Sequence, residues 1–274
     1  EKGKEGWLPP LEVLWADPTI TKASGDRLPL VWNPGGPVPI VIQRSSWRKD
    51  GAFVCLKGGS PSAPHGHMDG GNFILELGGV RWAHELPCEE YNRLEQMGIN
   101  LWWMDQKSTR WNLYRLNSQG HNVPAIDGAL QRAQGKASII EVKDGTANGE
   151  GSSAKLDLSS LYPAAKRALR EGVLAQDGRS YALTDTFVGL KSGASVTWQM
   201  VTRAAATADG NVLTLKDGGK TLTVRAPEEA VWTIAPAEGP KPLNTPNPGA
   251  TMVSFTLTAG DVDLKIPVNF TVEK

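Results

Sequence analysis

Glycine-rich and proline-rich turns break the sequence into short runs of β-prone residues. The chain contains 30 glycines and 19 prolines in 274 residues. Asp-Gly pairs such as Asp209-Gly210 and Asp217-Gly218 separate neighbouring runs, and Asp-Gly between such runs is a strong signal for a β-hairpin. Residues 221–225, Thr-Leu-Thr-Val-Arg, alternate between polar and apolar, as a half-buried antiparallel strand does. The pattern predicts an all-β fold, a large antiparallel two-sheet β-sandwich of the supersandwich type.

Two segments break this pattern and suggest one or two short helices. Residues 87–97 begin with proline, carry acidic residues in the first turn and precede Gly98, which predicts a helix. Residues 163–170 predict either a short helix or an irregular crossover. The expected strands are residues 28–32, 38–43, 53–56, 73–77, 111–116, 138–142, 181–188, 195–202, 212–215, 221–225, 231–234, 252–258 and 262–268.

A chain of 274 residues is long enough for one large domain or two smaller ones. We expect a β-sandwich domain over residues 1–234 and a proline-rich loop over residues 235–250. Residues 251–274 are expected to add C-terminal strands that pack on the same domain.

The charge balance and the cysteine content narrow the classes of function. Lys+Arg and Asp+Glu are equal at 29 each, which argues against a general nucleic-acid binder because such proteins carry a basic excess. No apolar run reaches the ~20 residues of a membrane-spanning helix. The two cysteines, Cys55 and Cys88, do not form a disulfide framework. We expect Cys55, in an apolar run, to be a buried free thiol.

All four histidines lie between positions 65 and 121, and two of them form the pair His65-Gly66-His67. Imidazole is well suited to metal ligation and to proton transfer near neutral pH. Residues two apart on an extended segment face the same side, so His65 and His67 are expected to point into one space. Asp69 is placed to join them or to orient one ring.

Glu85 and His121 are further candidate ligands beside the histidine pair and Asp69. Glu85 follows an apparent strand after the Gly78-Gly79 turn, and His121 ends another apparent strand. Two imidazoles and a carboxylate suit zinc and leave one position open. The alternative is that the histidine pair is merely solvated or satisfied by neighbouring polar groups.

The histidine pair also allows a second interpretation, a cupin metal site. Gly59, followed after five residues by His65-x-His67, also fits the start of a cupin metal motif. That motif requires a glutamate four or five residues after the second histidine, where this chain has Gly71 and Asn72.

The ten tryptophans are expected to lie mostly in the core. Trp102 and Trp103 cannot both face inward on a strand, and an exposed aromatic side chain would suit stacking on a sugar ring.

Several motifs occur together in a consistent order and spacing across residues 7–190. Taken together, they resemble the C-terminal β-domain of the heparinase II/III-like polysaccharide lyases. The opening residues 6–10, Gly-Trp-Leu-Pro-Pro, resemble the junction after the helical domain of that family. The other matching segments are Lys57-Gly-Gly59, His65 to Phe73, Gly79-Val-Arg-Trp82-Ala, Tyr91, His121-Asn122, Asp127-Gly128, Leu156-Asp157-Leu158 and Tyr162.

The resemblance implies a function for the protein. Members join an N-terminal (α/α) toroid to an antiparallel β-sandwich and bind substrate between the two domains. They cleave uronic-acid-containing polysaccharides or oligosaccharides by β-elimination. It also implies a bacterial protein that is periplasmic or secreted. Because the toroid would lie outside this sequence, we expect this chain alone to be inactive. The alternatives are a β-sandwich that binds glycans without catalysis and a cupin-like metal oxidoreductase.

The resemblance also assigns roles to individual residues. His65 matches the catalytic histidine of the β-domain. His67, Glu85 and His121 match the ligands of a structural divalent metal, for which zinc is the first choice. The family more often has aspartate at the position of Glu85, which puts the identity of the metal in question. Asp157 and Tyr162 match residues that we interpret as structural.

Overall fold

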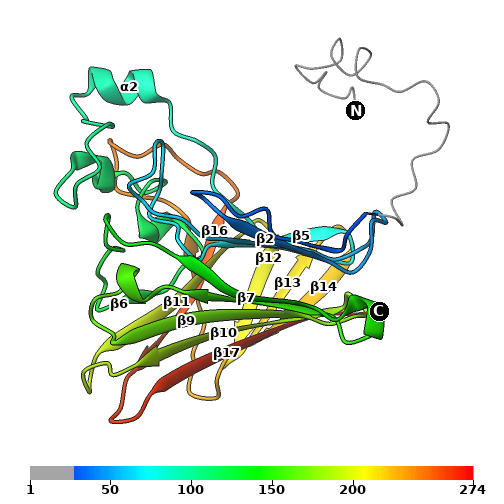
Figure 1. Cartoon of the computed structure of the whole chain (residues 1–274). Helices are drawn as coiled ribbons and strands as arrows, with labels where there is room; N and C mark the ends of the chain where they lie inside the picture. Colours follow the sequence, from blue (N-terminus) through cyan, green and yellow to red (C-terminus); the bar gives the residue numbers. More distant parts are fainter. Residues whose placement is uncertain (1–27, 274) are drawn as a thin grey trace, which may run out of the picture.

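The computed structural model describes residues 28–273, which form three antiparallel sheets arranged in two layers (Figure 1). The matched opening residues 6–10 lie outside the described residues. One sheet follows the order of the chain, with each strand paired to the next. It contains β1 (Val31–Trp32), β2 (Ile40–Arg44), β3 (Phe53–Lys57), β4 (Phe73–Leu77) and β5 (Val80–Ala83).

The largest sheet has eight strands in the order β12-β13-β14-β17-β10-β9-β8-β7. Its strands are β7 (Ser138–Asp144), β8 (Ser152–Asp157), β9 (Arg167–Leu174), β10 (Ser180–Val188), β12 (Ala205–Asp209), β13 (Val212–Asp217), β14 (Lys220–Arg225) and β17 (Leu264–Val272). The third sheet has the order β15-β16-β11-β6. It contains β6 (Ala125–Ile126), β11 (Ser195–Thr202), β15 (Thr233–Pro236) and β16 (Thr251–Thr258).

The core lies between the eight-stranded sheet and the other two sheets. Phe73 of β4 and Trp198 of β11 both contact Phe270 of β17, with ring centroids 6.1 Å and 6.3 Å apart. The five-stranded and four-stranded sheets adjoin where the His84 amide donates to the Val201 carbonyl at 2.9 Å. The expected all-β sandwich is therefore confirmed. The cupin alternative is wrong, because the described strands form sheets with free edges instead of a closed barrel.

Strand alternation explains most of the core. In β10, every second residue from Tyr181 onward is buried, because successive side chains of a strand point to opposite faces. The same period buries Ala154 and Leu156 in β8. The expected strands do not include β6, β8, β9 and β12. Of these, β8 and β12 lack the bulky β-prone residues of the other strands.

Two predicted elements have a different structure. Residues 111–116 were expected to form a strand, but the 3-10 helix Thr109–Asn112 and turns occupy this region. Residues 163–170 were expected to form a helix or crossover, but β9 begins at Arg167. The helix expected over residues 87–97 is confirmed in shorter form as α2 (Tyr91–Gln96). Cys55 and Cys88 are both free, and Cys55 is half-buried.

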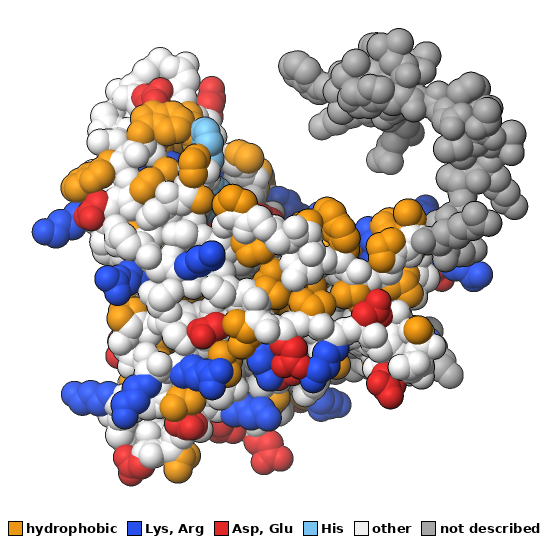
Figure 2. All heavy atoms as spheres, in the orientation of Figure 1, with side chains coloured by type: hydrophobic (Ala, Val, Ile, Leu, Met, Phe, Trp, Pro, Cys, Tyr) orange, Lys and Arg blue, Asp and Glu red, His pale blue; other side chains and the backbone are white. Residues whose placement is uncertain are grey.

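Within residues 28–273, the other 3-10 helices are Ser118–Gly120, Thr146–Asn148 and Ser159–Leu161. Among the described residues, no helix is long and apolar enough to cross a membrane. Basic and acidic side chains are interspersed on the face shown in Figure 2, and apolar side chains lie both near the end that carries α2 and across the middle of the face.

Much of the proline-rich segment 235–250 packs beside the loops near α2. Asn244 Oδ1 accepts a hydrogen bond from the Tyr114 amide at 2.6 Å. The buried Arg115 side chain donates to Asn247 Oδ1 at 2.8 Å and to the Pro246 carbonyl at 2.9 Å. The segment therefore supports the loop that leads to His121.

Candidate metal centre and cleft

A pocket of about 370 Å³ opens on the outer face of the five-stranded sheet. Side chains of β2, β3 and β4 form its floor, and two of the loops around it carry His65 and Glu85. Its lining residues are Ile40, Cys55, Lys57, His65, His67, Asp69, Asn72, Phe73, Ile74, Glu85, Leu86 and Cys88. Sequence positions from 40 to 88 thus converge on one cavity.

His67, Asp69 and His121 form a compact group of metal-ligating side chains. Each offers one ligand atom, and these atoms lie within 4.8 Å of one another. The rings of His67 and His121 have centroids 5.3 Å apart. Bonds of about 2.0–2.2 Å place neighbouring ligands of a tetrahedral zinc roughly 3.4 Å apart. The group can therefore hold such an ion after small side-chain movements.

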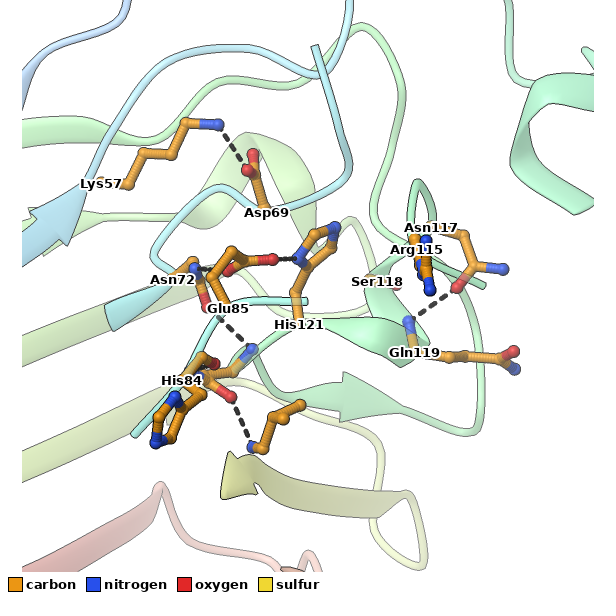
Figure 3. Close-up of polar contacts among 12 residues, drawn as sticks. Lys57, Asp69, Asn72, His84, Glu85, Arg115, Asn117, Ser118, Gln119 and His121 are labelled. Carbon is orange, nitrogen blue, oxygen red and sulfur yellow. Dashed lines mark hydrogen bonds and ion pairs between the residues drawn. The ribbon is translucent and has the colours of Figure 1, made fainter. Parts of the chain in front are cut away.

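Glu85 contacts the same cluster through the other nitrogen of His121. Its Oε1 lies 2.5 Å from His121 Nδ1, and its Oε2 accepts a hydrogen bond from the amide of Asn72 (Figure 3). His121 Nε2 is buried and has no hydrogen-bond partner. The geometry thus leaves Nε2 free for a metal, while Glu85 orients the ring as a carboxylate commonly does behind a metal-binding histidine.

The electrostatics favour a neutral His67 ring. Burial, followed by the charge of His121, lowers the pKa of His67 to about 3, so its lone pair is available for ligation at neutral pH. Burial would also lower the pKa of His121, but the charge of Glu85 and its hydrogen bond outweigh that effect and raise the pKa. The Lys57 ammonium forms an ion pair with Asp69, so a metal ion would share this carboxylate with Lys57.

Asn122 and Asn72 fix the loops that carry the cluster. The side-chain Nδ2 of Asn122 donates to the carbonyls of Phe73 at 2.7 Å and His84 at 2.9 Å. The backbone N–H of Asn122 donates to Asn72 Oδ1 at 2.8 Å. Gln199 Nε2 donates to the His121 carbonyl at 2.8 Å. These bonds link β4, β5 and β11 to the segment of His121.

Arg170 anchors the same loops from the opposite sheet. It is fully buried and forms a bidentate ion pair with the buried Asp185, with two N–H···O contacts of 2.7 Å. Its Nη1 also donates to the carbonyls of Gly71 at 2.8 Å and Asn122 at 2.7 Å. Arg170 was not among the residues expected at the site, because its segment was interpreted as a helix or crossover. Only a correct β9–β10 register, which pairs Arg170 with Asp185, would have identified it.

The backbone between the two histidines is held closely. A Cβ at Gly66 would come within 2.3 Å of the Pro61 carbonyl oxygen, so only glycine fits. The Gly66 carbonyl accepts a hydrogen bond of 2.8 Å from the buried Arg110, and the Met68 amide donates to Leu116 at 2.9 Å. Arg110 is a second buried arginine that the sequence analysis missed.

His65 lies at the exposed end of the pocket and has a left-handed backbone with φ of 57°. The expected extended segment is therefore wrong, although His65 and His67 do line one pocket. The His65 ring stacks on Tyr91 of α2, with centroids 5.9 Å apart and planes 13° apart. Trp102 packs almost perpendicular to it at 5.3 Å.

Comparison with known proteins identifies the fold. The profile of the family described as "Heparinase II/III-like, C-terminal" matches residues 44–260. A comparison with curated protein sequences finds no match. The crystal structure of heparan sulfate lyase HepC from Pedobacter heparinus has a TM-score of 0.70 and 13% identity, over 93% of this chain and 38% of that one.

Two heparinase III structures give similar results. One, a "Heparinase III-BT4657 gene product", has a TM-score of 0.63 and 15% identity, over 90% of this chain and 37% of that one. The other, "Crystal Structure of Heparinase III", has a TM-score of 0.61 and 10% identity, over 85% and 35%. This chain therefore spans little more than a third of the length of these lyases, and at such identities they establish the fold alone. The match over residues 44–260 shows that the chain belongs to the heparinase II/III-like C-terminal family.

Proposed function

We propose that this chain is the β-sandwich of a polysaccharide lyase that cleaves uronic-acid-containing glycans by β-elimination. The observation that carries the proposal is the placement of His65. Its exposed imidazole opens onto a pocket whose inner wall is formed by His67, Asp69 and Glu85. The family membership and the likeness to a heparan sulfate lyase support a glycan as the ligand.

The reaction requires three tasks of the protein. The uronate carboxylate must be neutralised, the proton on C5 removed, and the leaving O4 protonated. The C5 proton is only weakly acidic, so stabilisation of the developing enolate-like charge is the largest contribution to catalysis. We assign to His65 a proton-transfer or charge-stabilising role at the reacting sugar, since its ring is the exposed imidazole of the pocket.

The residues of the candidate centre fit a structural divalent metal, and zinc is our proposal for its identity. The unpartnered buried His121 Nε2 and the neutral His67 ring are suitable donors beside Asp69. A bound ion would tie the His65–Gly66–His67 loop to the loop of His121 and so hold His65 in place. The ion would take no part in the elimination.

The remaining catalytic groups are proposed to lie on an N-terminal (α/α) toroid of the same parent protein, packed over the pocket. The similar lyases are much longer than this chain. Since their substrates are extracellular glycans, we also propose that the parent protein is exported to the periplasm or secreted by a bacterium.

An elimination assay tests the proposal. The parent protein and this chain alone would be incubated with a panel of uronic-acid-containing glycans, and the absorbance of the unsaturated uronate product would be followed. We expect product from the parent protein and little or none from this chain. Metal analysis should give about one divalent ion per chain before chelation and much less after it. Robust turnover by this chain alone, or none by the parent on any uronan, would contradict the proposed division of labour.

A further inference from the structure

Three aromatic rings meet at the outer end of the pocket. The rings of His65 and Tyr91 are nearly parallel, and Trp102 packs edgewise against both, at 5.3 Å and 5.5 Å. Trp102 is nevertheless 56% exposed. A large aromatic side chain therefore stands in solvent in direct contact with the histidine of the pocket.

The exposed part of Trp102 is apolar. The only polar atom of the indole, Nε1, already donates a hydrogen bond to Glu95 Oε1 at 2.9 Å. The solvent-facing surface is therefore carbon, and exposure of this surface costs free energy that a ligand can recover by covering it. The C–H groups of a sugar ring carry partial positive charge and suit the negative face of an indole.

The loop that presents Trp102 is fixed before any ligand binds. Asn100 Oδ1 accepts hydrogen bonds from the amides of Trp102 at 3.2 Å and Trp103 at 3.0 Å. The Leu101 carbonyl accepts from the buried Arg110 at 2.9 Å. The same arginine holds the Gly66 carbonyl. One buried side chain thus sets the positions of both the Trp102 loop and the His65 loop, so little conformational entropy is lost when a ligand covers them.

The charge beside the indole restricts which sugar fits. The Glu95 carboxylate hydrogen-bonds the ring edge, and an anionic uronate over the same indole would be repelled by it. In a glycan that alternates uronate with N-acetylhexosamine, the rings on either side of an internal uronate at His65 are uncharged. Such a neutral ring is the better partner for Trp102.

We propose that Trp102 is a stacking platform for the neutral hexosamine next to the uronate at His65, an assignment that rests on the proposed lyase function. The platform selects glycans that alternate uronate with hexosamine over homopolymers of uronate. Trp102 acts by binding and positioning, and transfers no proton.

The test uses the whole parent protein and two probes, a tetrasaccharide of alternating glucuronate and N-acetylglucosamine and a tetramer of mannuronate. Trp102→Ala should weaken affinity for the alternating probe about tenfold, and in turnover the loss should fall on KM more than on kcat. Trp102→Phe should restore most of the affinity. The matched control is Trp103→Ala, since Trp103 is 48% exposed on the same loop and should change affinity by less than about twofold.

The outcomes separate this proposal from the lyase function. An unchanged affinity in Trp102→Ala, an equal loss in Trp103→Ala, or an equal loss for the mannuronate probe would overturn the platform. Calorimetry reports binding even without turnover. Trp102-dependent binding of the alternating probe without elimination would overturn the lyase assignment and leave the platform standing.

Discussion

His65 and His67 are separated by one glycine and lie in opposite surroundings. His67 is largely enclosed and close to His121 and Asp69. His65 is exposed, has a left-handed backbone and packs against the rings of Tyr91 in α2 and Trp102. The difference teaches that one short motif can serve two purposes. We propose that the more enclosed His67 ring stabilises the loops through a bound metal and that the exposed His65 ring meets the glycan.

The largest effect should come from His65. In the parent protein, His65→Ala should lower kcat by about 10²–10⁴-fold, the usual contribution of a positioned acid–base group. The unfolding free energy should change by less than roughly 1 kcal/mol, because the side chain is exposed. Elimination rates and thermal melts measure the two quantities. Retained activity together with a large loss of stability would show that His65 is structural and would break the comparison.

The second effect concerns Arg170, which holds the loops that carry His67 and His121. Arg170→Met should destabilise the protein by about 3–5 kcal/mol, because it leaves Asp185 buried without a partner. Chemical denaturation measures the change. The control Arg170→Met/Asp185→Leu removes both charges and should lose less stability than the single variant. A loss below about 1 kcal/mol for Arg170→Met would mean that these loops are held independently of the eight-stranded sheet.

The third effect separates His67 from His65 through the metal. His67→Ala should lower metal content and remove the stabilisation that metal provides, which is about 2.7 kcal/mol when the free ion is at 100 times its Kd. Thermal melts with zinc and with a chelator measure this difference. His65→Ala is the control and should respond to zinc as the unaltered protein does. Equal stabilisation by zinc in all three proteins would show that His67 is not a ligand of the metal.

The smallest effect distinguishes a ligand from an orienting group. Glu85 bonds to His121 Nδ1, so Glu85→Gln should weaken metal affinity by about 10–100-fold and retain one ion per chain at saturation. Asp69→Asn is the comparison variant, and it should lose more affinity because Asp69 offers a ligand atom. Zinc titration with a competing chelator measures both. A greater loss in Glu85→Gln would restore the ligand set expected from the sequence.

The sequence was sufficient to predict those strands that are marked by a turn or by alternating residues within the strand itself. The Gly78-Gly79 turn joins β4 to β5, and the alternating residues 221–225 form most of β14. The gathering of histidines also indicated the pocket. These features depend on residue spacing and on turns that glycine alone adopts easily.

Features that depend on distant contacts could not be predicted in this way. Residues 111–116 are rich in large side chains, but Leu113 and Leu116 pack with Leu94 and Leu101 in a small cluster beside α2, which replaces strand pairing. Arg170 can be buried in β9 because the strand register places Asp185 of β10 opposite it, and the two side chains form an ion pair. The orienting contact of Glu85 with His121 joins residues 36 positions apart. Tertiary packing overrides local propensity at each of these places.

The left-handed backbone of His65 has a consequence for the evolution of this loop. A non-glycine residue in that conformation costs about 1–2 kcal/mol, and glycine at position 65 would avoid the strain. Selection for a more stable fold alone would therefore favour the loss of this histidine. If His65 acts on the glycan as we propose, its imidazole is retained in a conformation that opposes it, as expected of a position selected for activity at the expense of stability. A stability screen of this chain should enrich glycine at position 65, and a screen for turnover in the parent protein should reject it.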